Sequence, residues 1–161
     1  MFKIKYIITL FTLIATFATA SAQIKIGDGF PDVQLQNNKN ATIKLNSFKG
    51  KTVLVDFWAS WCAPCRMANK NLVKLYDQYK GLNFEIVGIS IDNDKTKWLK
   101  AIEKDKLKHQ QLIDPKGFEA KTAVTFGVDA LPSTYLFDAS GKLIAINPTE
   151  AQIIAQIKKN K

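Results

Sequence analysis

Residues 52–66 read TVLVDFWASWCAPCR, and this stretch decides the fold class. Its first seven residues form an apolar run of strand length that is interrupted by Asp56. Such a run is typical of a strand that is covered on both faces. Pro64 follows where the first turn of a helix begins, and this position tolerates proline because no backbone donor is needed there. The stretch therefore predicts a buried strand that leads directly into a helix.

Periodic patterns on both sides of this stretch predict an α/β fold. Apolar residues recur at three- and four-residue steps between Ala68 and Tyr79, and Gly81 ends that predicted helix. Further elements are expected as a hairpin of 33–35 with 42–45, strands at 84–91, 134–138 and 142–146, and helices at 95–106, 116–126 and after the capping residue Thr149. The first strand–helix–strand unit should be a right-handed parallel crossover, and the late hairpin must be antiparallel. This order predicts a mixed sheet sandwiched by helices, with the cysteines at the edge where chemistry usually occurs in such sheets.

The first 22 residues have the layout of a secretory signal peptide. A short basic start precedes an apolar run from residue 6 to about residue 18, and the small residues Ala20-Ser21-Ala22 follow. The alternative is a retained membrane anchor, although the run is shorter than the roughly 18–20 residues that a spanning helix needs. We therefore expect residues 1–22 to be a signal peptide and residues 23–161 to form one exported domain.

The chain is basic, with 23 Lys and Arg against 14 Asp and Glu. Its formal net charge is +9, or +7 once Lys3 and Lys5 leave with the first 22 residues. A charge of this size is compatible with nucleic-acid binding, but every basic residue except Arg66 is a lysine and the lysines are scattered. We therefore expect no nucleic-acid partner. The densest group, six lysines within 95–108, is interpreted as a solvated helix face, with a docking face for an acidic partner as the alternative.

Cys62 and Cys65 are the only cysteines in the chain, and their spacing allows three interpretations. A structural zinc site needs about four ligands, whereas the only histidine, His109, lies more than forty residues away and is interpreted as an ordinary polar residue at a strand or loop edge. A structural disulfide is disfavoured because it would close a very short loop and so stabilise little. The third interpretation is a redox pair, and the exported context favours it.

A redox pair needs an acidic, accessible thiol beside a second thiol. Cys62 would stand at the opening of the predicted helix, where unpaired backbone donors and the helix dipole lower the pKa of a thiol. We expect Cys62 to be exposed and Cys65, one turn later, to point inward. The Cys62 thiolate would attack a substrate disulfide, and Cys65 would then release the reduced substrate and leave a Cys62–Cys65 bridge. Pro64 would stiffen the turn between the two sulfur atoms.

The segment VDFWASWCAPC (55–65) resembles the active-site segment of thioredoxins. Three stretches resemble the exported TlpA/ResA branch of that superfamily: FKGKTVLVDFWASWCAPCR (48–66), FEIVGISID (84–92) and FGVDALPSTYLFDASGKLIA (126–145). The resemblance covers roughly residues 25–157. It implies a thioredoxin-like fold with an N-terminal hairpin extension and an inserted helix within 92–126. It also implies a thiol–disulfide oxidoreductase that uses a redox-active disulfide and no cofactor.

The resemblance gives Asp56 a role, because this residue matches the family's buried aspartate six positions before the first cysteine. Burial should raise the pKa of its carboxyl. Asp56 would then accept a proton from Cys65 as that thiol attacks, directly or through water. The alternative is a structural carboxylate. Phe57 and Trp58, which follow it, are interpreted as packing residues.

The resemblance also implies a substrate-binding surface around the cysteines. Pro132 matches the family's cis-proline, and the Leu131 backbone beside it would pair with an extended substrate segment like an added strand. Trp61 is expected to be an exposed contact beside Cys62. Ala63 and Pro64 complete the predicted substrate-binding set.

Three positions depart from the family pattern. Gly88 lies in the strand where thioredoxin has a lysine near its buried aspartate. ResA-like proteins often have a glutamate after the second core strand, where this chain reads Asp92-Asn93-Asp94. Arg66 takes the place of a lysine and is expected either to hold negative charge nearby or to face solvent.

The function that the resemblance implies is reduction of disulfides in exported proteins, such as apocytochrome c during cytochrome c maturation. The protein would be a periplasmic monomer, soluble after signal cleavage or tethered to the inner membrane by an uncleaved signal, and a membrane thiol electron donor would reduce it again. One alternative is a copper carrier with Met67 or His109 as additional ligands. Another is a peroxiredoxin-like peroxidase, for which Ala59 stands where a threonine or serine would be expected three residues before Cys62.

Overall fold

The structure is a computed structural model that describes residues 23–160. The predicted signal peptide, residues 1–22, lies outside the described residues. Among residues 23–160, no helix combines the length and the apolar character that crossing a membrane requires.

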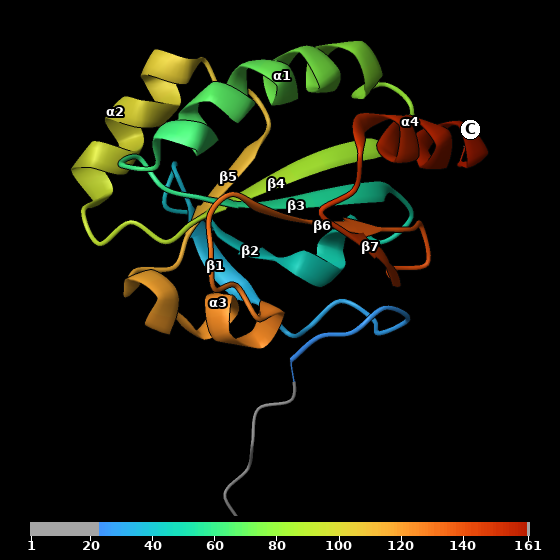
Figure 1. Cartoon of the computed structure of the whole chain (residues 1–161), viewed down its shortest axis with the longest axis horizontal. Helices are drawn as coiled ribbons and strands as arrows, with labels where there is room; N and C mark the ends of the chain where they lie inside the picture. Colours follow the sequence, from blue (N-terminus) through green and yellow to red (C-terminus); the bar gives the residue numbers. More distant parts are fainter. Residues whose placement is uncertain (1–22, 161) are drawn as a thin grey trace, which may run out of the picture.

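A seven-stranded mixed sheet forms the centre of the molecule, with the strand order β2-β1-β5-β4-β3-β6-β7 (Figure 1). Strands β3, β4 and β5 run parallel to one another, and all the other pairs are antiparallel. This arrangement confirms the predicted mixed sheet. The strands are β1 (Gln34–Asn37), β2 (Thr42–Lys44), β3 (Thr52–Trp58), β4 (Phe84–Ser90), β5 (Gln110–Ile113), β6 (Ser133–Phe137) and β7 (Leu143–Ile146).

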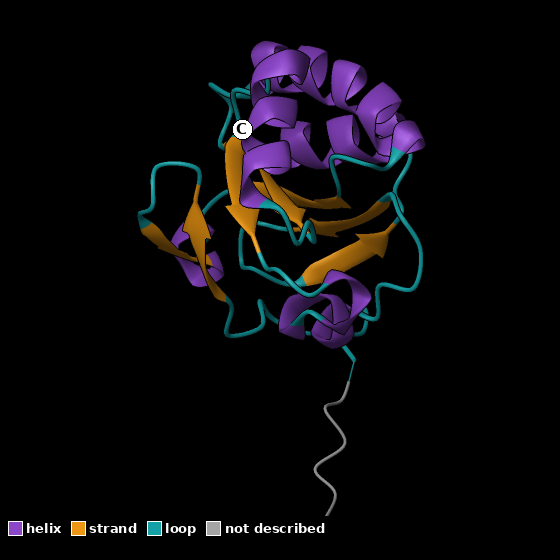
Figure 2. Ribbon diagram, turned by 90° about the vertical axis from the view of Figure 1, so that its left-hand side faces the viewer, coloured by secondary structure: helices purple, strands orange, loops and turns teal. Residues whose placement is uncertain are grey.

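Helices cover both faces of the sheet. Helices α1, α2 and α4 lie on one side of it and α3 on the other, as Figures 1 and 2 show. The helices are α1 (Ala63–Tyr79), α2 (Lys95–Asp105), α3 (Lys121–Phe126) and α4 (Glu150–Lys159), with short 3-10 turns η1 (Leu45–Phe48) and η2 (Gly117–Glu119). Helix α2 lies within the predicted insertion, residues 92–126, and covers the sheet on the same side as α1 and α4.

The central strand β3 divides its side chains between the two faces, and all seven of its residues are buried. Leu54 packs with Leu75 of α1 and Ile153 of α4, whereas the ring of Phe57 lies 5.0 Å from that of Phe126 in α3. Because successive strand residues point to opposite faces, Asp56 lies on the same face as Leu54, beneath α1.

Local signals in the sequence account for several helix ends. The Asp94 side chain accepts hydrogen bonds from the first turn of α2, and Gly127 ends α3 with a φ of 71°, which favours glycine. Thr149 caps α4 in a reciprocal capping box with Gln152. The predicted cap at Thr149 is therefore confirmed.

The structure corrects the predicted elements in the region between α2 and β6. Strand β5 was not predicted, because two glutamines at its start interrupt the apolar pattern that marks a buried strand. The helix expected at 116–126 is split into η2 and α3, since the backbone at Ala120 is not helical, with a ψ of 138°. His109 precedes strand β5, but it is only 3% exposed. It is therefore a buried core residue, and the expectation of an ordinary polar residue at a strand or loop edge is wrong.

Candidate active site

The two cysteines stand where β3 gives way to α1. Cys62 is the N-cap residue of α1, and its Sγ accepts a hydrogen bond from the Cys65 backbone N at 3.2 Å. A disulfide joins the two residues, whose Cα atoms lie 5.3 Å apart. Pro64 occupies the first turn of the helix, as predicted. The pair is thus at the carboxyl edge of the central strand, with the first sulfur atom directed at the free donors of the helix.

The expectation that Cys62 is exposed is wrong for the disulfide form. In the disulfide form its side chain is 5% exposed, against 1% for Cys65. The reason is geometric, because the Cys62 sulfur is turned toward the helix by its bond to Cys65 and by the backbone donor that it accepts. The expectation that Cys65 points inward is confirmed, because Cys65 is the more buried of the two cysteines. Trp61 is 60% exposed beside them, and Ala63 and Pro64 are also exposed.

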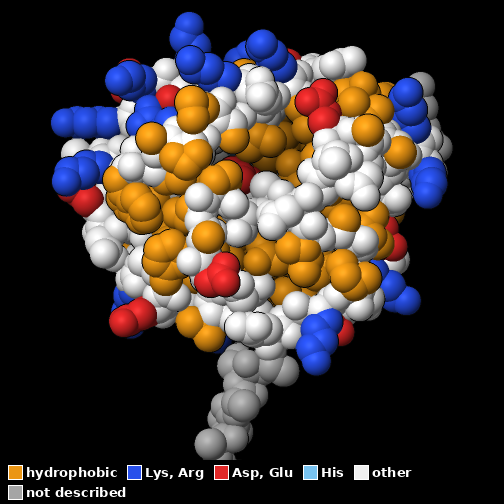
Figure 3. All heavy atoms as spheres, in the orientation of Figure 1, with side chains coloured by type: hydrophobic (Ala, Val, Ile, Leu, Met, Phe, Trp, Pro, Cys, Tyr) orange, Lys and Arg blue, Asp and Glu red, His pale blue; other side chains and the backbone are white. Residues whose placement is uncertain are grey.

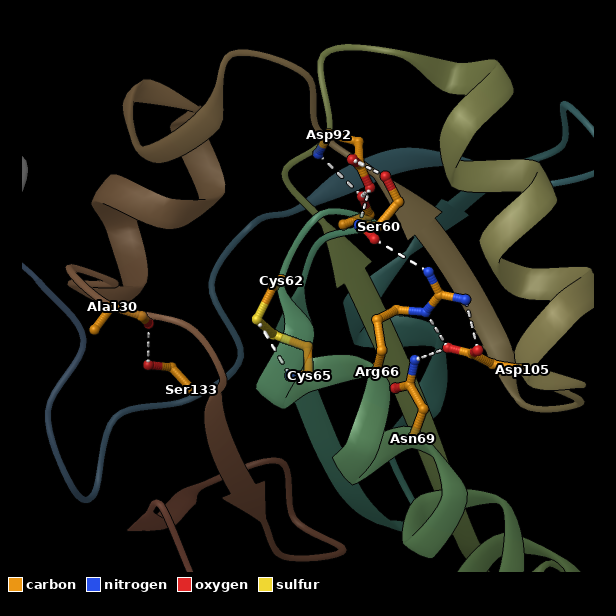
Figure 4. The surroundings of a disulfide bond; sticks show 10 residues. Ser60, Cys62, Cys65, Arg66, Asn69, Asp92, Asp105, Ala130 and Ser133 are labelled. Atoms are coloured by element: carbon orange, nitrogen blue, oxygen red, sulfur yellow. Dashed lines mark hydrogen bonds and ion pairs between the residues drawn. A yellow bond between two sulfur atoms is a disulfide. The ribbon is translucent and has the colours of Figure 1, made fainter.

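The segment that precedes β6 faces the disulfide. The Leu131–Pro132 peptide bond is cis, as the resemblance implied. Ser133 pairs with Phe57 near the end of β3, which places this bond beside the strand that leads to the cysteines. Figure 4 shows the Ala130–Ser133 segment on one side of the disulfide, with the Ser133 hydroxyl donating to the Ala130 carbonyl at 2.7 Å.

Asp56 is a buried acid beneath the redox helix. Its side chain is 3% exposed, and it lies on the face of the sheet that α1 covers. Burial raises the pKa of its carboxyl to about 7, because the charged form loses its hydration. The predicted direction of this shift is confirmed. With this pKa the group is divided between its neutral and charged forms at neutral pH.

Asp92 anchors the loop that carries the cysteines, a role that the sequence analysis did not assign. It is 1% exposed and follows β4. Its carboxylate accepts hydrogen bonds from the Ser60 backbone N at 2.8 Å, the Ser60 hydroxyl at 2.7 Å and the Ser90 hydroxyl at 2.7 Å (Figure 4). A carboxylate with this many donors is a structural anchor. The feature of the sequence that could have predicted this role is the position of Asp92, directly after the strand expected at 84–91.

Arg66 joins the start of α1 to the end of α2. Its guanidinium forms a two-pronged ion pair with Asp105, with one contact from Nη2 to Oδ1 at 2.6 Å and another from Nε to Oδ2, and its Nη1 donates to the Ser60 carbonyl at 3.1 Å. The Asn69 amide donates to the same carboxylate at 2.7 Å. Burial disfavours the charged form of Asp105, but the hydrogen bonds from Arg66 and Asn69 outweigh it and lower the pKa of the carboxyl. Of the two expected roles, holding negative charge is the one observed.

The interior on the Asp56 face of the sheet contains a residue whose role was not predicted. Gln111 of β5 is 1% exposed, and its Oε1 accepts a hydrogen bond from the Trp58 indole Nε1 at 3.0 Å. Phe57 and Trp58 are fully buried, so the packing role expected for both is confirmed. The signal for Gln111 was Gly88, whose missing side chain makes room for the glutamine amide.

A basic groove begins at Trp61 and runs between α1 and α2. Two adjoining depressions of about 280 and 430 Å³ share Trp61, Arg66 and Lys104 in their walls. We call this surface the lysine groove, and its exposed members are Trp61, Ala63, Met67, Lys70, Lys97, Lys100 and Lys104. Figure 3 shows Lys and Arg side chains gathered beside hydrophobic surface at the part of the molecule that carries α1 and α2.

The ligands considered for a copper carrier do not share a site. Met67 lies beside Trp61 in the first turns of α1, whereas the His109 ring lies 5.6 Å from that of Tyr76. Tyr76 is nine residues further along the same helix, or about 13 Å along its axis. Residues 23–160 contain no group of three or more His, Cys, Asp and Glu side chains placed to hold a metal ion.

The fold and the site together define a class of protein. A mixed sheet with a helix-capping Cys-x-x-Cys disulfide, a buried acid and a facing cis-proline is the arrangement of a thioredoxin-fold thiol–disulfide oxidoreductase. A family model described as the AhpC/TSA family matches residues 26–146, and the chain belongs to this family.

Individual relatives agree with this class. The chain is 32% identical over 134 residues to the thiol-disulfide oxidoreductase ResA of Bacillus thuringiensis subsp. konkukian, a match that covers 83% of this chain and 76% of that protein. Among solved structures it is similar to the thioredoxin domain of a thiol-disulfide oxidoreductase from Bacteroides vulgatus, with a TM-score of 0.75, 31% identity and coverage of 85% and 98% of the two chains. A thiol-disulfide oxidoreductase from Bacteroides fragilis gives a TM-score of 0.74 at 32% identity, with coverage of 82% and 98%. The chain is therefore a ResA-like thiol–disulfide oxidoreductase.

Proposed function

We propose that this protein reduces disulfides of exported proteins, such as apocytochrome c, through a Cys62–Cys65 dithiol–disulfide cycle. The observation that carries the proposal is the position of Cys62, whose sulfur atom caps α1 and accepts a backbone hydrogen bond. In the reduced protein the same position stabilises a thiolate, because helix donors and the helix dipole favour negative charge there.

The cycle transfers two electrons from the protein to its substrate. The Cys62 thiolate attacks one sulfur atom of the substrate disulfide, that bond breaks, and a mixed disulfide forms while one substrate thiolate leaves. The Cys65 thiol then loses its proton and attacks the Cys62 sulfur. The second substrate thiolate is released, and the Cys62–Cys65 disulfide remains. A membrane thiol donor returns the pair to the dithiol.

Asp56 supports the second attack as the proton acceptor for Cys65. Its pKa of about 7 suits this task, because a base works best when its pKa lies near the working pH. The acid lies beneath α1, the helix that carries Cys65 on its inner side. The proton passes directly or through one water molecule, and Asp56 gives it up again when the disulfide is reduced.

The substrate segment binds across the surface formed by Trp61, Ala63, Pro64, Leu131 and Pro132. An extended peptide pairs with the Leu131 backbone as an added strand, while the exposed Trp61 ring supplies apolar contact beside Cys62. The lysine groove continues this surface and suits acidic residues of the partner. The protein acts as a monomer, without a cofactor, in the periplasm, where it is soluble or tethered by its N-terminal segment.

Trapping of the mixed disulfide tests the proposal. Cys65→Ser removes the attacking thiol, so a substrate should remain linked to Cys62 and be recovered as a covalent adduct from cells. Cys62→Ser is the matched control and should form none. Equal recovery from the two variants, or none from either, would overturn the mechanism. Rapid consumption of hydrogen peroxide by the reduced protein, with no exchange on protein disulfides, would favour the peroxidase alternative.

A further inference from the structure

The Gln111 amide has an unpaired donor in the interior. Its Oε1 accepts the hydrogen bond from Trp58 at 3.0 Å, but its Nε2 has no hydrogen-bond partner among residues 23–160. The side chain is 1% exposed, so bulk water does not solvate this donor. Buried polar groups without a partner are rare in native proteins, and each one calls for an explanation.

The amide lies directly over Gly88. A Cβ atom built on Gly88 would stand 2.5 Å from Gln111 Oε1 and 2.7 Å from its Nε2, so the amide fills the space of the missing side chain. Gly88 is the lateral neighbour of Gln111 on one side and of Asp56 on the other. Lateral neighbours in a sheet point to the same face. The glutamine side chain therefore crosses β4 on the face that carries Asp56.

Trp58 determines which end of the amide is free. An indole nitrogen only donates, so the amide must present its oxygen to Trp58 and keep its NH₂ group for another acceptor. Trp58 lies two residues after Asp56 in β3, on the same face. The amide thus ends beside the strand that holds the buried acid.

The other titratable groups on this face leave the Asp56 carboxylate without a positive partner. They include Cys65 and Tyr76 of α1, Asp105 of α2, His109 before β5 and Asp92 after β4, whereas the lysines of α1, α2 and α4 are exposed. Burial lowers the pKa of His109 to about 4, so its ring is uncharged at neutral pH. The one arginine, Arg66, is paired with Asp105. The charged form of Asp56 can therefore be stabilised here by a hydrogen bond from an uncharged donor, and no cation within residues 23–160 lies beside it.

We propose that Gln111 is a positioning residue for Asp56, whose Nε2 donates to the Asp56 carboxylate, directly or through one water molecule, in the reduced protein. This inference rests on the proposed role of Asp56 as proton acceptor for Cys65. A donor stabilises the charged carboxylate and so opposes the effect of burial on its pKa. Gly88 is the residue that lets the amide reach across the strand between them.

Gln111→Met tests the contact, because methionine has nearly the length of glutamine but cannot donate. The pKa of Asp56 in the reduced protein, measured by carbon NMR of labelled aspartate carboxyl groups, should rise by about one unit. The pH midpoint of the Cys65 attack should rise by the same amount. Gln110→Met is the matched control, because Gln110 is the preceding residue and points to the opposite face; it should leave the pKa of Asp56 unchanged.

Gly88→Ala provides an independent second variant. Its methyl group displaces the amide without removing the donor, and the pKa of Asp56 should again rise. Gly81→Ala, where an added Cβ meets nothing within 4 Å, is the control. If Gln111 only accepts the bond from Trp58, Gln111→Met will lower stability while the pKa of Asp56 matches that of the parent, and this result would overturn the proposal. The NMR titration requires no turnover, so failure of the proposed oxidoreductase cycle would be recognised separately.

Discussion

Asp92 accepts two hydrogen bonds from Ser60, one from the backbone N at 2.8 Å and one from the hydroxyl at 2.7 Å. Ser60 precedes the cysteine pair, and Asp92 follows the neighbouring strand, β4. The contact therefore ties the redox loop to the edge of the sheet. Arg66 holds the same loop from the other side through the Ser60 carbonyl.

Asp92→Ala should destabilise the protein, because it leaves the half-buried donors of Ser60 and the buried hydroxyl of Ser90 without an acceptor. We expect the free energy of unfolding to fall by about 2–3 kcal/mol, measured by urea denaturation. Asp32→Asn, at an exposed aspartate, is the control and should stay close to the parent. Equal stabilities of parent and Asp92→Ala would show that the loop does not depend on this anchor.

Asp56→Asn should change both stability and turnover in a pH-dependent way. The pKa of Asp56 is about 7 in the folded protein and 3.8 in a solvated aspartate, so between these values the folded state holds a proton that the unfolded chain has released. The stability of the parent therefore falls as the pH rises from about 4 to 7, by on the order of 4 kcal/mol at most. Asparagine does not titrate, so the variant should be the more stable protein at pH 8 and lose this dependence.

The same variant should slow the attack of Cys65 on the mixed disulfide, because the proton acceptor is gone. Urea denaturation and single-turnover kinetics across this pH range measure the two effects. Parallel stability curves for parent and variant would contradict the raised pKa. Identical rates at every pH would contradict the role of Asp56 as a proton acceptor.

Arg66→Lys should weaken the connection between α1 and α2 although it keeps the charge. A lysine cannot reproduce the two-pronged contact with Asp105, and we expect a loss of about 1–2 kcal/mol in the free energy of unfolding. A double-mutant cycle with Asp105→Asn isolates the pair. Additive effects of the two substitutions would mean that the ion pair contributes no coupling energy.

Charge reversal in the lysine groove should lower the rate of reaction with acidic substrates and leave the rate with neutral substrates unchanged. Lys100→Glu with Lys104→Glu should lower kcat/KM about tenfold at low salt for a peptide whose disulfide is flanked by glutamates. The rate with the small neutral disulfide of 2-mercaptoethanol should stay unchanged. Lys158→Glu with Lys159→Glu, in the last turn of α4, is the matched control. An equal loss with both substrates would indicate a structural effect, and no loss with the peptide would remove the groove from substrate binding.

Much of the fold was predictable because its strongest signals are local. The apolar run of β3, the proline in the first turn of α1 and the cap at Thr149 each act through neighbours in the chain, and all three predictions are confirmed. Strand β5 was not predictable in this way. Its glutamines look exposed in the sequence, and they belong to a buried strand only because β4 and β1 flank it.

The sequence by itself determined the chemistry: a cysteine pair at the start of a helix, with an aspartate six residues earlier in an apolar strand. Tertiary structure alone decided how that chemistry is held. It attached Asp92 to Ser60 and Arg66 to Asp105, and it placed the Gln111 amide over Gly88. Asp92 lies 32 positions after Ser60 in the sequence, and Asp105 lies 39 positions after Arg66. Such pairings depend on strand order and helix packing, and no local pattern of residues encodes them.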